Sequence, residues 1–270
     1  CLDDCGVPWR RILFPHEAAG WRADRGLPDL TAMPVSGATW DDLDPLEFVR
    51  LRRMVKDNQG DVALLKLPDQ EIAQALGMVR TEDGKAHPTL AGLLLVGTED
   101  ALAEYVPSHE VAFQVLRGTD VVVNELRRWP LLHTLEWVME SFQVRHEEQE
   151  LNVGAFRVGV SNYDLWGFRE TVNNALIHRD YTRLGAIHIQ MYEDYLRVSN
   201  PGGFVEGVGP DNILVTEPRP RNPRLADAFQ RIGLVERTGR GVDTIYVGQL
   251  KNGRRPPDYT LSTSVSVNVV

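Results

Sequence analysis

The stretch "FRETVNNALIHRDYTRLG", residues 168–185, places Glu170, Asn174 and His178 at a strict spacing of four residues. On a helix of 3.6 residues per turn, side chains at this spacing stack along one face. The apolar residues lie on the roughly opposite face, where they are expected to pack: Leu165, Phe168, Val172 and Leu176. The sequence therefore predicts an amphipathic helix whose polar stripe is either a functional site or a solvated surface.

The composition is typical of a globular chain. It has 270 residues, 43% of them apolar and 25% charged, which is enough for one large or two ordinary domains. The net charge of −9 disfavours contact with polyanions over most of the surface. Nucleic-acid binding by this chain would therefore need a local basic patch, and the best candidate is the short run "RPRNPR", residues 219–224.

Few features bear on the compartment. The two cysteines, Cys1 and Cys5, are too few for a disulfide framework and indicate reduced thiols. No apolar run approaches the length of a membrane span, and the start lacks a signal-peptide pattern. We therefore expect a soluble cytoplasmic protein without a membrane partner. The first residue is not Met, so we also expect the chain to begin inside a longer protein.

Hydrophobic periodicity predicts an α+β fold. Helices are expected at 44–58, 67–79, 129–144, 165–178, 222–233 and 239–250, and strands at 109–118, 149–162, 185–203 and 259–270. Asp44 is the expected N-cap of the first helix, because Pro45 follows it. The helix at 67–79 could belong to a helix-turn-helix, but the sequence after it favours a turn and a buried apolar segment. Between 185 and 203 two strands are expected about a turn at Glu193–Asp194.

These elements suggest three parts. Residues 1–40 are broken by prolines and read as irregular, residues 41–145 form a helical or mixed linking region, and residues 146–270 form the region that carries the motifs. We expect a mostly antiparallel sheet in the last part, with helices on one face.

Three motifs follow one another within the last part: Glu170-x-x-x-Asn174, then Asn200-Pro201-Gly202-Gly203, then Thr238-Gly239-Arg240-Gly241. A glycine-rich turn lets the backbone approach a ligand closely, and one that opens a helix directs free N–H groups at phosphates. A carboxylate one turn before an amide can orient water beside a metal that the amide holds. Taken singly, the motifs are explained by a solvated helix face, a tight turn and a helix entry. Together they indicate a nucleotide site.

The chain resembles a known family over residues of about 85–250. The segments that match are "HPTLAGLLLVG", "RETVNNALIHRDY", "LRVSNPGGF" and "RNPRLADAFQRIGLVERTGRGV". They are similar to the divergent GHKL-type ATP-binding region of bacterial proteins labelled RecG-like helicases or predicted transcriptional regulators, which usually carry an N-terminal Schlafen AlbA-type DNA-binding domain. The resemblance implies a Bergerat-type α/β sandwich with ATP between sheet and lid. Residues 1–40 would be a remnant of the AlbA-type domain or a linker.

The resemblance also implies roles. Glu170 matches the carboxylate that activates water, and Asn174 matches the amide that binds magnesium. Asn200 stands where the superfamily has the Asp that accepts from adenine, and an amide oxygen can accept that bond without charge. The remaining expected cofactor-binding positions are the first glycine box, the lid and the second glycine box: Gly202, Gly203, Arg221, Asn222, Gly239, Arg240 and Gly241. No role is implied for His178 or Asp180.

Other activities fit the residues poorly. A helicase motor needs a P-loop, and Gly84-Lys85 is followed by Ala86 rather than Ser or Thr. The "HRD" at 178–180 lacks the Asn of a kinase catalytic loop, because Gly185 stands at that position. No Gly-x-Ser-x-Gly elbow occurs, and the histidines are scattered rather than clustered as metal ligands.

Two hypotheses remain. In the first, the chain binds ATP and Mg²⁺ and hydrolyses ATP slowly within a DNA-associated transcriptional regulator. In the second, the same fold is a non-catalytic binding or dimerisation module. Both place DNA binding in domains outside this chain, and both allow a homo-oligomer. An open cleft between the motifs is required by the first hypothesis, and a cleft filled with side chains would exclude it.

Overall fold

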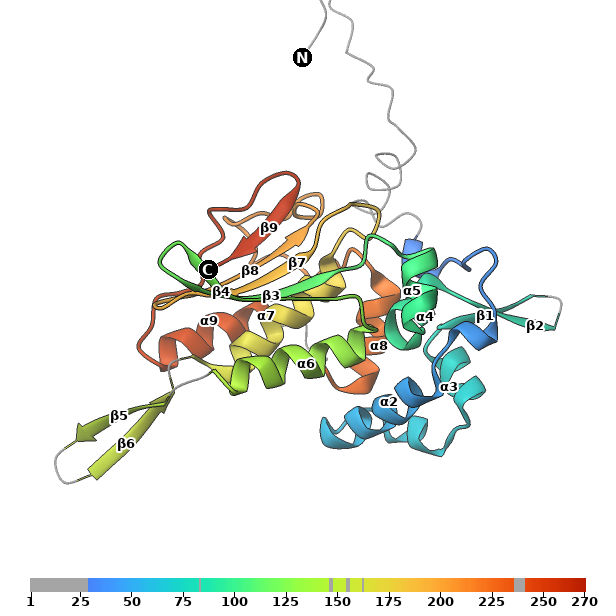
Figure 1. The fold of residues 1–270 in the computed structure, drawn as a ribbon, viewed down its shortest axis with the longest axis horizontal. Helices are drawn as coiled ribbons and strands as arrows, with labels where there is room; N and C mark the ends of the chain where they lie inside the picture. Colours follow the sequence, from blue (N-terminus) through green and yellow to red (C-terminus); the bar gives the residue numbers. More distant parts are fainter. Residues whose placement is uncertain (1–28, 83, 146–147, 154–155, 162, 236–240) are drawn as a thin grey trace, which may run out of the picture.

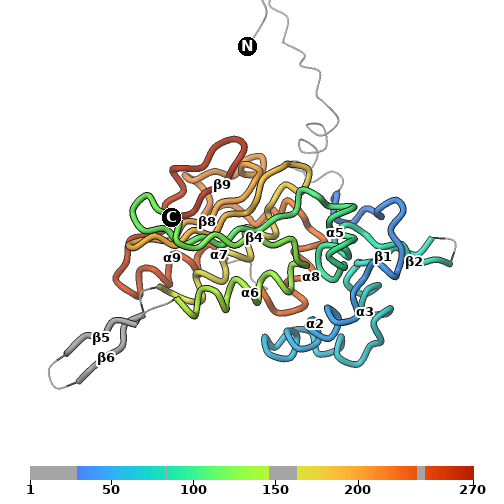
Figure 2. The backbone as a smooth tube through the Cα atoms, in the orientation of Figure 1, coloured from blue at the N-terminus to red at the C-terminus, as the bar shows by residue number. Residues whose placement is uncertain are grey.

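The fold is seen in a computed structural model of the protein (Figure 1), which describes residues 29–82, 84–145, 148–153, 156–161, 163–235 and 241–270. The expected N-terminal remnant, residues 1–40, therefore lies mostly outside the described residues. The chain passes from N-terminal helices, in blue and cyan, into a sheet and its covering helices, in green to red (Figure 2). The α+β fold class predicted from the sequence is confirmed.

The N-terminal part is mainly helical. Its elements are η1 (Leu30–Ala32), η2 (Trp40–Asp42), α2 (Pro45–Asp57), η3 (Val62–Lys66), α3 (Asp69–Ala75), β1 (Val79–Glu82), β2 (Lys85–Pro88), α4 (Leu90–Val96) and α5 (Glu99–Tyr105). The side chain of Asp44 caps α2 by accepting from the N–H of Leu46, as the sequence predicted. A β-hairpin, rather than a second helix, follows α3. The apolar segment expected after the turn is helix α4, which is buried from Ala91 to Val96.

The sheet has five strands, which are β3 (Val111–Arg117), β4 (Asp120–Arg127), β7 (Ile187–Met191), β8 (Leu196–Pro201) and β9 (Ser266–Val269). Their order is β4-β3-β7-β8-β9, and every neighbouring pair is antiparallel except β3 with β7. The mostly antiparallel sheet is therefore confirmed. Two of its strands, β3 and β4, precede residue 146, and the other three follow it. A domain boundary between residues 145 and 146 would therefore divide one sheet.

Three strand details differ from the sequence prediction. The pattern does not predict β4, because this strand lies at the sheet edge and most of its side chains are exposed. The single strand expected at 149–162 is a hairpin of β5 (Glu148–Val153) and β6 (Phe156–Ser161). The C-terminal strand is limited to β9, because the preceding residues form turns in which Thr263 donates to the carbonyl of Ser266.

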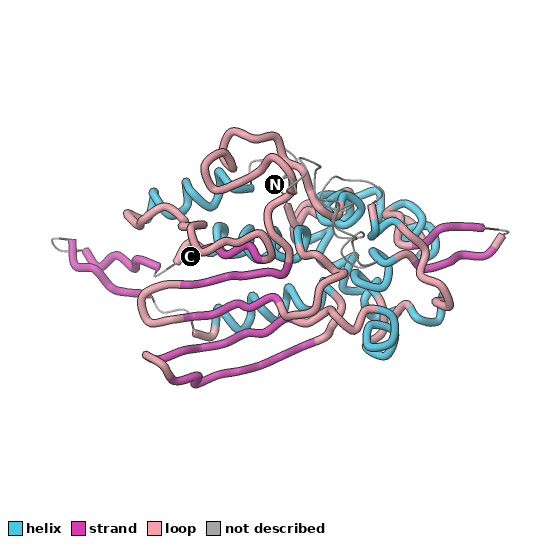
Figure 3. The backbone as a smooth tube through the Cα atoms, turned by 90° about the horizontal axis from the view of Figure 1, so that it is seen from above, coloured by secondary structure: helices cyan, strands magenta, loops and turns pink. Residues whose placement is uncertain are grey.

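Helices cover one face of the sheet. The covering helices are α6 (Leu131–Gln143), α7 (Leu165–His178) and α9 (Gly241–Lys251), while α8 (Pro223–Ile232) lies toward the N-terminal part (Figure 1). Seen from above, the strands lie over the helices (Figure 3). The result is the two-layer α/β sandwich that the sequence predicted.

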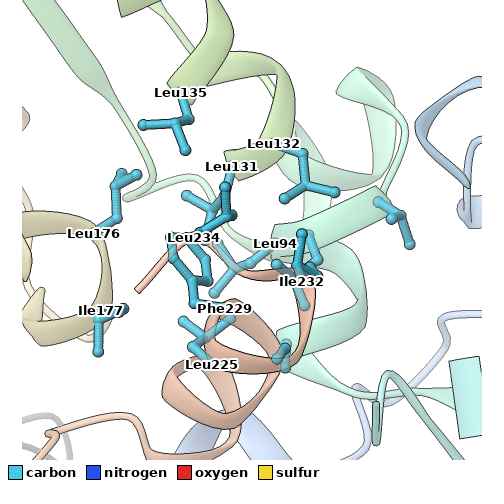
Figure 4. Close-up of a cluster of buried hydrophobic side chains, with 14 of the residues drawn as sticks. Leu94, Leu131, Leu132, Leu135, Leu176, Ile177, Leu225, Phe229, Ile232 and Leu234 are labelled. Atoms are coloured by element: carbon cyan, nitrogen blue, oxygen red, sulfur yellow. The ribbon is translucent and has the colours of Figure 1, made fainter. Parts of the chain in front are cut away.

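A shared apolar core joins the N-terminal part to the sandwich (Figure 4). Its side chains come from α4, α6, α7, α8 and the segment just after α8. They are Leu94, Leu131, Leu132, Leu135, Leu176, Ile177, Leu225, Phe229, Ile232 and Leu234. Burial of each such side chain contributes about 1.5–3 kcal/mol to folding. Because α7 and α8 both carry residues of the site, this core fixes the site's geometry.

Candidate functional site

One cleft of about 480 Å³ opens between α7, α8, the start of α9, the strands β8 and β9, and the loop that follows β8. Five of the positions predicted from the sequence line it together: Glu170, Asn174, Asn200, Gly203 and Gly241. Its volume is within the range of small-molecule sites. The cleft between the motifs is open, which is the outcome that the nucleotide hypothesis required.

The polar stripe of α7 faces this cleft. Glu170, Asn174 and His178 all line it, and the opposite side of the helix is buried by Phe168, Val172 and Leu176. Asp164 is the N-cap of α7, and its carboxylate accepts from the N–H of Gly167 at 2.7 Å. Leu165, expected to pack, is exposed because it lies in the first turn before the core begins. The stripe therefore lines a cleft rather than an open solvated surface.

The side chain of Glu170, in α7, lies against the first residue of α9. Its side chain is 8% exposed, and the amide of Asn174 donates to its Oε1 at 3.4 Å. A Cβ on Gly241 would overlap the same oxygen, so the Glu170 carboxylate in this position lies directly against the glycine. The second glycine box thus meets the first motif at one end of the cleft.

The other end of the cleft is formed where β8 ends. Asn200 is buried in β8 opposite Val267, and its amide group lies along the cleft wall. Gly203 also lines the cleft, and a Cβ there would lie 2.7 Å from the carbonyl carbon of Ser264. Gly202 has a φ of +101° and faces Asp180, whose Cβ would be 2.8 Å from a Cβ at Gly202. Gly202 therefore allows β8 to approach α7, and it does not line the cleft.

Arg221 and Asn222 were expected in a lid, but they are buried behind the cleft and do not line it. The guanidinium of Arg221 donates from Nε to the carbonyl of His178 at 3.1 Å and from Nη2 to that of Gly203 at 2.7 Å. The amide of Asn222 donates to the carbonyls of Ile177 at 2.7 Å and Arg179 at 2.8 Å. These bonds satisfy carbonyls at the end of α7. The geometry gives both residues a bracing role at the helix end.

The expected positions Gly239 and Arg240 lie outside the described residues. Only Gly241 of the second glycine box is placed. The segment that leads toward this box is held by α7, because the amide of Asn173 donates to the carbonyl of Leu234 at 2.7 Å. The guanidinium of Arg169 donates to the carbonyls of Gly233 and Leu234 at 3.2 and 3.3 Å.

Several cleft residues carry no sequence signal. Apolar side chains from β8, β9, α9 and the loop after β8 form much of the wall: Val198, Val205, Ile213, Leu214, Ile245, Val267 and Val269. Charged side chains also contribute, namely Glu217, Asp227, Asp243 and Arg219. These apolar and charged residues come from five separate segments (β8, the loop after it, α8, α9 and β9) that only the tertiary fold brings together. Arg219 belongs to the basic run considered for nucleic acid, and it lies beside acidic residues rather than in a basic patch.

His178 is the third member of the stripe and the one without an expected role. Burial, assisted by the nearby Arg221, lowers its pKa from 6.5 to about 4. The imidazole is therefore neutral at pH 7, when one ring nitrogen donates and the other accepts.

The residues of the cleft bear on its possible ligands. Among the described residues, no group of three or more His, Cys, Asp and Glu side chains could hold a metal by itself. Mg²⁺ commonly takes one or two protein oxygens and completes its shell with water and phosphate oxygens. The side-chain oxygen of Asn174 fits that arrangement as a single protein ligand, and the apolar wall fits a planar base. Within the described part of the chain, no helix is long and apolar enough to cross a membrane.

Comparisons with family models give two matches. Residues 185–270 match the model described as "Putative ATP-dependent DNA helicase recG C-terminal". Residues 22–112 match a model described as a domain of unknown function, DUF8451. The first match contains Asn200 and the glycines of the cleft, but it begins after α7. No curated protein matches the chain.

Among solved structures, the chain is similar to the DIP2311 protein from Corynebacterium diphtheriae, with a TM-score of 0.74 and 24% sequence identity. The similarity covers 100% of this chain and 54% of that protein, so the chain spans about half of its length. At this identity the similarity shows a shared fold.

Proposed function

We propose that the chain is a GHKL-type nucleotide-binding region and that the cleft takes ATP with Mg²⁺. The observation that carries the proposal is the convergence of three sequence motifs on one open cleft of about 480 Å³. The match of residues 185–270 to a model named for a RecG-like ATP-dependent protein supports it independently.

The two ends of the cleft suit different parts of a nucleotide. The start of α9 beside Glu170 offers backbone N–H groups to phosphates, as helix N-termini do. The strand end has an apolar wall and the amide of Asn200, which suits a base that needs one polar partner. This arrangement orients the phosphates toward Glu170 and the nucleoside toward Asn200.

Charge decides what must accompany the phosphates. The described acidic side chains that line the cleft are Glu170, Glu217, Asp227 and Asp243, against the single described cation Arg219. A triphosphate in such a site requires compensation by a cation. Bound Mg²⁺ would supply that charge and polarise the terminal phosphate, with Asn174 as the residue that would hold it.

Glu170 has the position for hydrolysis. In this proposal its carboxylate accepts a hydrogen bond from a water molecule and orients it for in-line attack on the terminal phosphate. Asn174 keeps that carboxylate in place through its amide. A slow ATPase that changes the α7–α9 contact on binding would suit a regulator, with DNA bound by other domains and with a homo-oligomer as the working form.

Isothermal titration with a non-hydrolysable ATP analogue and Mg²⁺ tests binding, with wild type beside Asn174→Ala. Asn212→Ala is the matched control, because Asn212 lies in the loop after β8 and binds the carbonyl of Gly207 outside the cleft. Saturable binding that Asn174→Ala loses and Asn212→Ala keeps supports the proposal. Absence of binding at millimolar analogue would overturn it.

A turnover assay tests hydrolysis separately. We expect Glu170→Gln to bind the analogue and to release phosphate at least about 100-fold more slowly than wild type, since it loses general-base assistance. Binding without any turnover in wild type would instead favour the second candidate, a non-catalytic nucleotide-binding or dimerisation module. The acidic cleft is the observation that favours this alternative, because it opposes a triphosphate unless a cation is present.

A further inference from the structure

His178 is the part of the α7 stripe that the proposed function leaves unused. It lies two turns beyond Glu170, about 12 Å along the helix at 1.5 Å per residue. Both residues line the same cleft, so the stripe extends from the phosphate end to the far end. A side chain at that position meets a different part of the ligand from Glu170.

The backbone around His178 fixes it next to the strand end. Arg221 binds the carbonyl of His178 with Nε and the carbonyl of Gly203 with Nη2, so one buried guanidinium holds both residues. Gly203 and Asn200 line the cleft at this end. The imidazole therefore shares its end of the cleft with the amide of Asn200.

The ring is also available. Within the described residues no side chain or backbone group is hydrogen-bonded to either ring nitrogen of His178, although other polar groups of the helix end are paired. A partly buried imidazole without a protein partner leaves hydrogen-bonding capacity for water or ligand. As a neutral ring it can both donate and accept, which matches a ribose hydroxyl or the edge of a base.

We propose that His178 contacts the nucleoside part of the bound nucleotide through its imidazole and contributes to selection of that part. This inference rests on the proposed function, because it assumes a nucleotide in the cleft. It assigns the stripe a division of labour, with Glu170 and Asn174 at the phosphates and His178 at the nucleoside.

The test compares ligands that contain or lack the nucleoside. Wild type, His178→Ala, His178→Gln and Asn174→Ala are titrated with the ATP analogue and with inorganic triphosphate, each with Mg²⁺. Loss of one hydrogen bond to the nucleoside should weaken analogue binding by His178→Ala roughly fivefold to tenfold and leave triphosphate binding unchanged. Asn174→Ala should weaken both ligands.

Two variants guard against an effect of folding. His178→Gln keeps a donor and an acceptor and should recover most of the analogue affinity. His87→Ala, in β2 outside the cleft, should bind as wild type. Circular dichroism and thermal melting confirm that each variant is folded.

The failures are distinguishable. Equal analogue affinity in wild type and His178→Ala overturns the His178 contact and leaves the proposed function intact. Equal weakening of analogue and triphosphate binding by His178→Ala also overturns it, because the effect would not lie at the nucleoside. No analogue binding by wild type overturns the proposed function and this contact together.

Discussion

Gly241 begins α9 directly against the carboxylate of Glu170 in α7, whose Oε1 occupies the place that a Cβ on Gly241 would take. A second glycine of α9 repeats the contact further along, where a Cβ on Gly248 would lie 2.7 Å from Cγ of Asp164. The two helices therefore run antiparallel and meet at two glycine–carboxylate contacts. One of these contacts is in the cleft and the other is outside it.

This pair of glycines gives a matched test. We expect both Gly241→Ala and Gly248→Ala to change the free energy of unfolding by less than about 1 kcal/mol, because each methyl group displaces a carboxylate side chain while alanine is favoured over glycine within a helix by about 1 kcal/mol. Only Gly241→Ala should also weaken binding of the ATP analogue, since only Gly241 lies at the cleft. Urea unfolding and isothermal titration measure the two effects. An equal loss of binding in both variants would contradict a specific role for the Gly241–Glu170 contact.

Acid should destabilise the protein through His109. Its side chain is fully buried, Nε2 lies 2.8 Å from the carbonyl of Trp129, and burial lowers its pKa from 6.5 to about 4. Above pH 6.5 the ring is neutral in both states, so its contribution is complete. Between pH 6.5 and 4 the unfolded chain binds a proton that the folded chain does not, so stability falls by about 1.4 kcal/mol per pH unit.

Urea unfolding at pH 7, 6 and 5 measures this slope. His109→Gln removes the titrating group while keeping a side-chain donor for the carbonyl of Trp129, so the fall with decreasing pH should be shallower than in wild type. The variant is expected to be less stable at pH 7, and only the difference in slope is diagnostic. Identical slopes in the two proteins would exclude His109 as the source.

The sequence predicts a helix well where a periodic pattern of apolar residues follows an N-cap signal. The α2 helix follows from Asp44 and Pro45, and α7 follows from its apolar and polar stripes. The edge strand β4 is missed, because an exposed strand lacks the alternation that burial imposes. The parallel pairing of β3 with β7 is not readable either, since it depends on contacts between residues far apart in the chain.

For the candidate site, too, the sequence predicts some residues and not others. Motif spacing predicts that Glu170 and Asn174 face one side, and the fold brings Asn200, Gly203 and Gly241 to that side. Spacing cannot reveal that Arg221 and Asn222 turn inward, because their partners are backbone carbonyls at the end of α7. A basic or amide residue before a helix looks the same in sequence whether it binds a ligand or braces a backbone.

The brace at the end of α7 can be tested with Asn222. Removal of its amide in Asn222→Ala leaves the buried carbonyls of Ile177 and Arg179 without these partners, so we expect a loss of about 1–3 kcal/mol in unfolding free energy. Urea unfolding measures the loss. Asn212→Ala removes bonds within a surface loop and should cost less than about 1 kcal/mol. If Asn222→Ala kept full stability but lost nucleotide affinity, the residue would act at the ligand after all.

The last prediction concerns Arg179 of the "HRD" segment. Among the described residues it is the largest fully buried side chain, and it carries a charge. The guanidinium of Arg179 donates to the backbone carbonyls of Ser108, Asp180, Arg183 and Gly185, which joins the end of α7 to the approaches of β3 and β7. A lysine cannot reach four carbonyls from one ammonium group. We expect Arg179→Lys to lower the free energy of unfolding by about 2–4 kcal/mol.

Arg183 is the matched control for this substitution. It lies four residues further on, its side chain is 40% exposed, and its Nε binds Oδ2 of Asp180 at 3.0 Å. Because Arg183 is itself exposed and lysine keeps its positive charge beside the carboxylate of Asp180, Arg183→Lys should cost less than about 1 kcal/mol. Thermal and urea unfolding of the two variants measure the contrast. Equal losses would mean that the carbonyl contacts of Arg179 contribute no more to stability than the Arg183–Asp180 ion pair. The burial of Arg179 would then need another explanation.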